Sequence, residues 1–150
     1  MALEPRKDPY RGFNFRLEVG GLTVASFSEV SGLVAEGDPV DYREGDEGVN
    51  WVRKLIGLRK FNQIVLKRGY TRNTELWDWY GKIARGVNDR RDGAVVLMDE
   101  ARKDVLRWEF KKAWPNKVEG PSLNATGNEV SMESMELCHE GLELKLAPAA

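Results

Sequence analysis

Alternation of apolar and polar residues is the main pattern in this chain, and it predicts β-strands along most of its length. Between positions 13 and 19 every second residue is apolar, which is the period of a strand with one buried face. Further strands are expected at about residues 22–31, 34–42, 51–55 and 63–68. Pro39 predicts an edge strand or a bulge within 34–42, because proline cannot donate a hydrogen bond to a ladder.

The C-terminal half continues the same pattern. Strands are expected at about residues 94–98, 104–114, 129–137 and 142–146. Trp114-Pro115 is expected to break the second of these strands. The apolar positions of 129–137 change parity along the segment, and an extra residue near Ser134 therefore predicts a β-bulge.

A helical period occurs at about residues 74–85, where apolar residues recur three or four positions apart. The expected buried stripe consists of Leu76, Trp77, Tyr80, Ile83 and Ala84. Asn73 is the expected N-cap. These elements predict a mainly β fold of the α+β kind, with two packed antiparallel sheets forming a sandwich or barrel and one flanking α-helix. At 150 residues we expect a single domain, 1–150, with residues 1–12 as an extended N-terminal arm.

Composition and charge narrow the function classes. The net charge of −1 does not favour a general nucleic-acid binder, because binding to phosphates would need a local basic patch. The longest apolar run, Ala94–Met98, is far shorter than the ~20 residues that span a bilayer, and residues 1–9 contain no apolar segment typical of a signal peptide. The single cysteine, Cys138, excludes an intramolecular disulfide framework and fits a reducing cytoplasm.

The stretch 36–72 changes the picture because its charge inverts. Six acidic residues and one basic residue occupy 36–47, whereas 53–72 contains basic residues and no acidic residue. The hinge between them, Gly45-Asp46-Glu47-Gly48, is typical of the tip of a loop or long hairpin. An acidic arm followed by a basic arm could bind the opposite arms of further copies head to tail. A solvated surface would explain the same pattern.

Candidate chemistry is sparse. Cys138 and His139 are the only thiol and imidazole; as neighbours on a strand they would point to opposite faces, so they cannot form a nucleophile–base pair. Acidic residues in 38–47 could bind calcium, but their spacing fits no EF-hand loop. The basic segment has few interleaved aromatic residues for a nucleic-acid groove. We therefore predict no catalytic residue, no cofactor and no metal site.

Several short motifs, in order, resemble the tail tube proteins of contractile phages and of phage-tail-like (extracellular contractile) injection systems. The motifs are residues 27–33 (FSEVSGL), 42–45 (YREG), 66–69 (LKRG), 76–79 (LWDW), 114–115 (WP), 120–121 (GP) and 123–125 (LNA). They cover about residues 8–143. Members of this family often carry a proline between the residues that match Leu55 and Gly57, where this chain has Ile56.

The resemblance implies a structural, non-enzymatic subunit whose fold is similar to that of the type VI secretion tube protein. Hexameric rings would stack into a hollow tube inside a contractile sheath, and sheath contraction would drive the tube through a target envelope. The implied partners are further copies of the chain, the sheath protein, baseplate and tail-terminator proteins, and luminal cargo or DNA bound without sequence specificity, with no stable membrane insertion. The subunit would assemble in the cytoplasm and then belong to a phage tail or extracellular particle.

The resemblance also gives the charged stretch a role, because residues 40–56 are expected to form an extended loop or hairpin that reaches an adjacent subunit. The residues expected to contact that subunit are Asp41, Tyr42, Glu44, Asp46, Glu47, Trp51, Arg53, Lys54, Leu55, Arg59, Lys60, Lys67 and Arg68. The alternative function is a monomeric β-barrel that binds a small ligand or nucleic acid.

Overall fold

The computed structural model describes residues 14–20, 27–46, 48, 50–69, 74–127 and 131–146. Its elements are, in chain order, β1 (Phe15–Val19), β2 (Phe27–Ser31), β3 (Ala35–Gly37), β4 (Val40–Tyr42), β5 (Arg53–Leu55), β6 (Arg59–Phe61), β7 (Ile64–Gly69), α1 (Glu75–Ala84), β8 (Arg91–Met98), β9 (Asp104–Glu119), β10 (Met132–Cys138) and β11 (Leu142–Leu146). The predicted dominance of strands, with one α-helix among the described residues, is confirmed.

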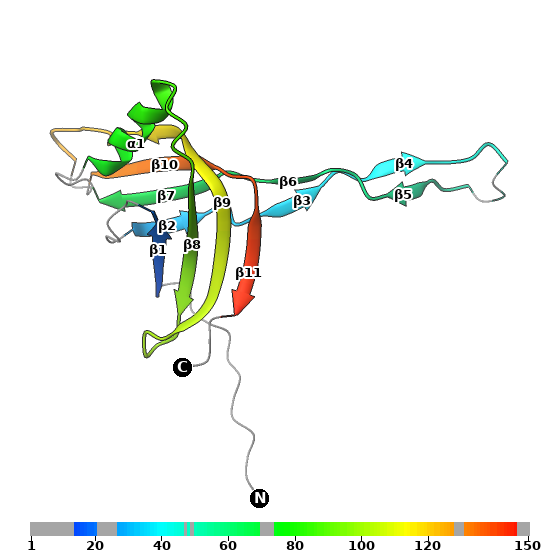
Figure 1. The fold of residues 1–150 in the computed structure, drawn as a ribbon, viewed down its shortest axis with the longest axis horizontal. Helices are drawn as coiled ribbons and strands as arrows, with labels where there is room; N and C mark the ends of the chain where they lie inside the picture. The colour runs from blue at the N-terminus through cyan, green and yellow to red at the C-terminus, as the bar shows by residue number, and fades with distance from the viewer. Residues whose placement is uncertain are drawn as a thin grey trace, which may run out of the picture.

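Two antiparallel layers share the long strand β9 (Figure 1). Sheet A consists of β1, β8, the N-terminal part of β9 and β11, and sheet B consists of the C-terminal part of β9, β10, β7 and β2. The pair of antiparallel sheets is confirmed. The barrel alternative is wrong, because β1 and β2 lie at opposite ends of the strand order and no ladder joins them in the described part of the chain.

The bend between the two layers lies within β9 at Lys111 and Lys112. The register with β8 shifts there, since Gly93 pairs with Phe110 but Arg91 pairs with Ala113. Lys112 has a positive φ of 52°, and its backbone N–H donates to Asp92 Oδ1 at 2.9 Å. A left-handed residue in a bulge bends its strand, which lets one strand serve both sheets.

Trp114-Pro115 does not break β9, contrary to the expectation from the sequence. The strand continues to Glu119, and Pro115 lies opposite Leu137 on β10. The register shifts between Glu136 and Leu137, so this proline sits at an irregularity of the ladder, where a missing donor is tolerated.

The helix α1 turns only part of the predicted stripe to the core: Leu76 and Ile83 pack there as expected, but Trp79 takes the place of Trp77. Leu76 and Trp79 are buried, whereas Trp77 is 41% exposed. Trp79 Nε1 donates to the carbonyl of Asp89 at 2.8 Å, and the Arg91 guanidinium lies 4.6 Å from the centre of a Trp79 ring. The predicted N-cap, Asn73, falls outside the described residues, and Thr74 precedes the helix.

The predicted bulge near Ser134 is also wrong. β10 pairs with β7 in unbroken register, and its buried positions are Glu133, Met135 and Leu137. The parity change in the sequence arises because a carboxylate occupies a core position. Glu133 lies opposite Arg68, whose Nε donates to Glu133 Oε1, and their side chains are only 1% and 5% exposed.

Candidate inter-subunit surface

A two-stranded ribbon, residues 35–61, projects from one side of the sheets (Figure 1). Its base pairs β3 with β6, and its outer part pairs β4 with β5, both antiparallel. β2 and β7, the outermost pair of sheet B, lead directly into β3 and β6, so the ribbon extends the layer of sheet B. The alternation of the sequence places successive side chains on opposite faces of this ribbon.

The outer part of the ribbon has one charged and one largely apolar face. Asp41 and Lys54 are register partners and form an ion pair on the charged face. Val40 pairs with Leu55 on the other face, which also carries Tyr42 and its partner Arg53. The acidic and basic arms that the sequence predicted for binding to different copies thus lie against each other in one copy.

Other charges of the ribbon also have partners in the same chain. Lys60 Nζ lies 3.2 Å from Asp38 Oδ1, and this contact raises the pKa of Lys60. The Tyr42 hydroxyl donates to Glu44 Oε1 at 3.1 Å. These groups are exposed, so solvent screens each pair and its contribution to stability is small.

The rest of the predicted contact set is spread over several places. Lys67, on β7, lies 3.7 Å from Glu29 of the same chain. Arg68 is buried against Glu133, so it cannot act as a surface contact. Asp46 lies in the exposed turn at the ribbon tip, and Glu47 falls outside the described residues.

Exposed apolar residues concentrate on the ribbon. Trp51 is 69% exposed, Ile56 88% and Leu58 86%, and Val40, Tyr42 and Leu55 are each about half exposed. An isolated two-stranded ribbon is marginally stable in water, and exposed apolar residues gathered on one element are typical of an interaction site. The ribbon is therefore the described segment most in need of a partner.

His139 anchors the base of the ribbon. Its Nε2 lies 3.1 Å from the carbonyl oxygen of Asn62, just after β6, and its Nδ1 lies 3.0 Å from that of Gly141. The ring also packs on Phe61 and Phe110, at centroid distances of 5.3 and 6.3 Å. This role, which spacing in the sequence could not reveal, is structural.

Cys138, beside it, shows no sign of activation. Burial raises the pKa of the Cys138 thiol, with a further contribution from the charge of Glu136. A raised pKa lowers the thiolate fraction and hence nucleophilicity. Within the described ranges no group of three or more His, Cys, Asp or Glu residues could hold a metal ion.

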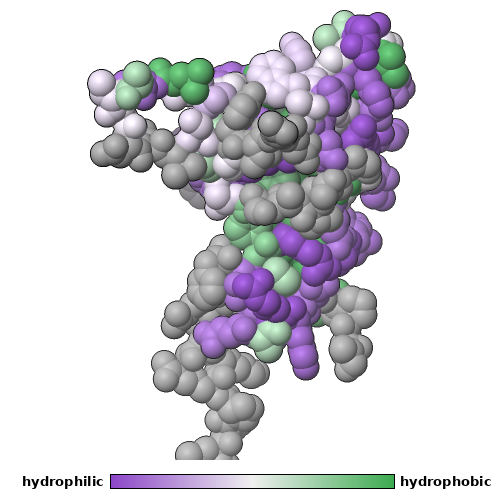
Figure 2. Space-filling model, turned by 90° about the vertical axis from the view of Figure 1, so that its left-hand side faces the viewer, coloured by the Kyte–Doolittle hydropathy of each residue, from purple (hydrophilic) through white to green (hydrophobic). Residues whose placement is uncertain are grey.

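A second apolar surface lies between the two layers, at the open side of the sandwich. A groove of about 210 Å³ is lined by two polar residues, Ser28 and Glu29, and by six apolar residues, Phe15, Val30, Leu33, Val95, Leu97 and Trp108. Phe15, Val95, Leu97 and Trp108 share the face of sheet A that turns towards sheet B. Figure 2 shows apolar residues gathered in the middle of the face that it presents. We call these six residues the groove.

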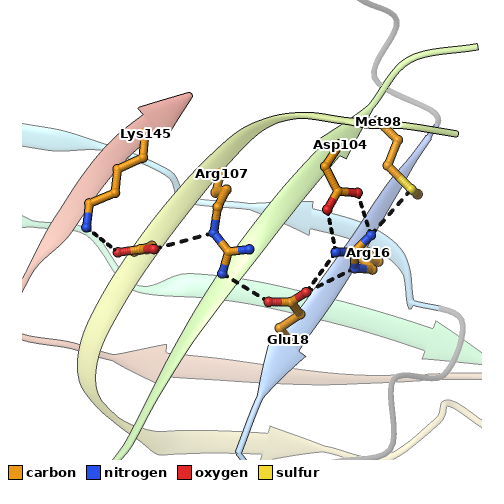
Figure 3. Close-up of polar contacts among 7 residues, drawn as sticks. Arg16, Glu18, Met98, Asp104, Arg107 and Lys145 are labelled. Atoms are coloured by element: carbon orange, nitrogen blue, oxygen red, sulfur yellow. Dashed lines mark hydrogen bonds and ion pairs between the residues drawn. The ribbon is translucent and has the colours of Figure 1, made fainter. Parts of the chain in front are cut away.

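The opposite face of sheet A carries a network of ion pairs (Figure 3). Arg16 on β1 contacts both Asp104 oxygens, at 2.6 and 2.7 Å, and also Glu18 at 2.8 Å. Arg107 on β9 donates to Glu18 Oε2 at 3.0 Å. Residues nearly 90 positions apart thus join β1 to β9, a juxtaposition that follows only from the strand pairing.

The network extends to β11 through Glu109, which lies 2.8 Å from Lys145 Nζ and 3.4 Å from Arg107 Nε. Bonding to the adjacent cations holds the pKa values of three carboxyls below their usual range: Glu18 through Arg16, Asp104 through Arg16, and Glu109 through Lys145. Figure 3 shows cations and anions alternating across the sheet. This face is polar, yet its described charges are largely compensated.

In the two large sheets, three strands present an unpaired edge among the described residues. β1 pairs with β8 only, β11 with β9 only, and β2 with β7 only. Unpaired edges bind other strands readily, so stable proteins cover them or pair them. No helix in the described part of the chain is long and apolar enough to span a bilayer.

Solved structures with a similar fold come from contractile injection systems. A chain of the PVC sheath–tube complex, an extracellular contractile injection system in its extended state, is similar with a TM-score of 0.83 and 27% identity over 93% of each chain. A chain of the anti-feeding prophage cap structure, described as the tube-terminating cap, gives 0.85 and 25% over 97% of each chain.

The fold extends to more distant proteins. Hcp1 from Flavobacterium johnsoniae shares it with a TM-score of 0.59 and 16% identity, over 88% of this chain and 94% of that one. A sequence search of curated proteins gives no significant match. The profile of the family described as T4-like virus tail tube protein gp19 matches residues 11–143. The chain belongs to this family of tail tube proteins and is a structural subunit of a tube.

Proposed function

We propose that the chain forms the inner tube of a contractile phage tail or injection particle, as closed hexameric rings that stack on one another. The observation that carries this proposal is the ribbon, whose apolar face has no cover within the described chain. In a head-to-tail contact each copy binds one neighbour through one surface and a second neighbour through another. The copies form a closed ring when the rotation that relates successive copies adds up to a full turn.

The free edges of sheet A support a route to ring closure. β1 and β11 are the two outer strands of this sheet, on opposite sides of β8 and β9. Pairing β11 of one copy with β1 of the next would remove both edges and continue the sheet around the ring. Since sheet B covers the apolar face of sheet A, the polar face would turn towards the bore.

A bore lined by this face suits a channel for varied cargo or DNA. Arg16, Glu18, Asp104 and Arg107 already satisfy one another, so they offer few unpaired charges to a passing molecule. The tube would then conduct its contents without sequence-specific binding. The absence of an activated nucleophile at Cys138 is consistent with a non-enzymatic role.

The further partners follow from the proteins that this chain resembles. The similar chains come from structures described as a sheath–tube complex, a tube-terminating cap and a baseplate. We infer that this subunit likewise contacts a sheath, a baseplate and a terminator, that it assembles in the cytoplasm, and that it ends in a phage tail or extracellular particle.

The ribbon would reach an adjacent subunit, with the apolar side chains of Tyr42, Trp51 and Leu55 supplying most of the affinity. The exposed charges would set orientation, because such pairs are individually weak. The charged residues that we retain as contacts are Asp41, Glu44, Asp46, Glu47, Arg53, Lys54, Arg59, Lys60 and Lys67.

The test is the assembly state of the purified protein, measured by light scattering and negative-stain microscopy over a range of concentrations. Six-fold rings or tubes are expected. A monomer that persists at high concentration and moderate salt would overturn the proposal and favour a monomeric binding module. Charge reversal at Asp46 and Glu47 should weaken stacking, and unchanged assembly would exclude those two contacts only.

A further inference from the structure

The groove and the ribbon are surfaces of matching apolar chemistry on one chain, and neither covers the other within the described residues. The groove exposes apolar side chains from both layers, among them Leu33, Leu97 and Trp108. The ribbon exposes Val40, Tyr42 and Leu55 on one face. Each copy carries one groove and one ribbon. In a head-to-tail assembly every ribbon could therefore cover the groove of a neighbouring copy.

The arrangement of the two sheets also favours contact between the ribbon of one copy and the groove of another. The ribbon prolongs β2 and β7 and therefore continues the layer of sheet B beyond the edge of its own molecule (Figure 1). A neighbour placed beside β11 would present its own sheet A to this layer. The part of that sheet left open towards sheet B is the groove, where the neighbour's β1 and β2 are not paired.

Charge favours one face of the ribbon over the other. The apolar face ends in the cation Arg53, and the lining of the groove includes the anion Glu29, which also lies 3.7 Å from Lys67 of its own chain. The opposite face holds the Asp41–Lys54 ion pair, which would lose its hydration in an apolar groove without gaining a partner.

We propose that the groove binds the apolar face of the ribbon of a second copy, with Leu55 and Tyr42 packed against Leu97 and Trp108. This inference rests on the proposed assembly and adds its receptor surface. The second copy is the occupant that satisfies both surfaces at once. The sheath, or another segment of the same chain, would leave the ribbon's apolar face exposed.

Cysteine cross-linking between two single-cysteine proteins tests this contact directly. Both carry Cys138→Ser; one also carries Leu55→Cys and the other Leu97→Cys, so a cross-link between the two can form only between copies. The mixture is assembled and treated with a short bismaleimide. The matched control replaces Leu55→Cys by Lys54→Cys, a neighbouring position on the charged face.

A cross-linked dimer from Leu55→Cys with Leu97→Cys, at least about tenfold more abundant than from the Lys54→Cys control, is the expected result. Tubes that assemble normally while the two pairs cross-link equally or not at all would overturn the groove assignment and leave the tube proposal standing. Failure of the unmodified protein to assemble would overturn the tube proposal itself. If Leu97→Cys does not fold, Leu33→Cys at the same groove takes its place, with the same deciding outcomes.

An independent measurement uses the critical concentration for assembly. Leu55→Ser removes an apolar side chain that is 47% exposed in the single copy and would become buried in the contact. The variant loses the free energy of burying about half of a leucine side chain on assembly. Its critical concentration should therefore rise about five- to tenfold. An unchanged critical concentration would contradict the assignment, provided that the variant melts at the same temperature as the unmodified subunit.

Discussion

The buried pair of Arg68 and Glu133 makes a quantitative prediction about the stability of the subunit. The two side chains are almost fully buried between β7 and β10, and the Arg68 guanidinium also lies 5.7 Å from the centre of the Phe27 ring. Among the described residues Glu133 Oε2 has no hydrogen-bond partner. Removing either member breaks this buried ion pair, which costs about 3–5 kcal/mol.

The perturbations are Arg68→Met, Glu133→Leu and the double variant. Each single variant should lose about 3–5 kcal/mol of unfolding free energy, or roughly 6–20 °C in Tm for a chain of this size. The double variant should lie within about 1–2 kcal/mol of the unmodified protein, because an apolar pair of similar volume needs no desolvation of charge. The lost contact with Phe27 costs it about 0.5–2 kcal/mol.

The assay is urea unfolding followed by tryptophan fluorescence, at a concentration where light scattering shows only the monomer. Comparing the four proteins as a double-mutant cycle isolates the coupling between the two side chains. Single variants that lose less than about 1 kcal/mol would refute the argument, since the site would then behave as solvated. A double variant as unstable as the sum of the singles would refute it equally.

Three smaller predictions concern the network, the ribbon base and the bend. The carboxylates of the network have lowered pKa values in the folded protein, so they stabilise it above their unfolded pKa of about 4. This stabilisation is lost as the pH falls through the folded pKa values. In Arg16→Met, the melting temperature should therefore fall less steeply with decreasing pH than in the unmodified protein. His139→Ala removes two contacts and should cost about 1–3 kcal/mol and speed amide exchange near Asn62, with partial recovery in His139→Gln. Lys112→Gly should gain up to about 1 kcal/mol in chemical unfolding because φ is positive there, whereas Lys112→Ala should gain nothing.

Strand existence could be predicted from the sequence because alternation directly records one buried face. The predicted segments around 13–19, 63–68 and 142–146 overlap β1, β7 and β11. Residues 59–61 gave no such signal, since β6 belongs to a ribbon that has no buried core on either side. The signal is uneven where pairing occurs without burial, since the predicted segments 34–42 and 51–55 contain β3, β4 and β5 of the same ribbon, whereas β6 was missed.

The incorrect fold predictions occur where a contact between distant segments overrides a local sequence rule. Proline was expected to end β9, but a register shift between β9 and β10, with Asn116 unpaired, accommodates Pro115. Trp79 was left out of the helix stripe, yet its indole is fully buried, with its N–H bonded to Asp89. Position 133 was not recognised as a core position because it carries a glutamate. Its partner Arg68 lies 65 residues away in the sequence, so the pairing could not be predicted from local pattern.

The charge inversion of 36–72 illustrates why a contact within one copy and a contact between copies are hard to separate in sequence. Asp41 pairs with Lys54, and Glu36 lies opposite Lys60, so opposite charges occupy almost symmetrical positions on the two strands of the ribbon. A hairpin that pairs its own strands produces this mirror arrangement, whereas binding to another copy sets no such symmetry. The symmetric charges therefore serve chiefly to hold the ribbon together. The apolar residues would then supply most of the affinity for a neighbour and the exposed charges only its orientation, so we expect substitutions on the apolar face to weaken assembly more than substitutions of the paired charges.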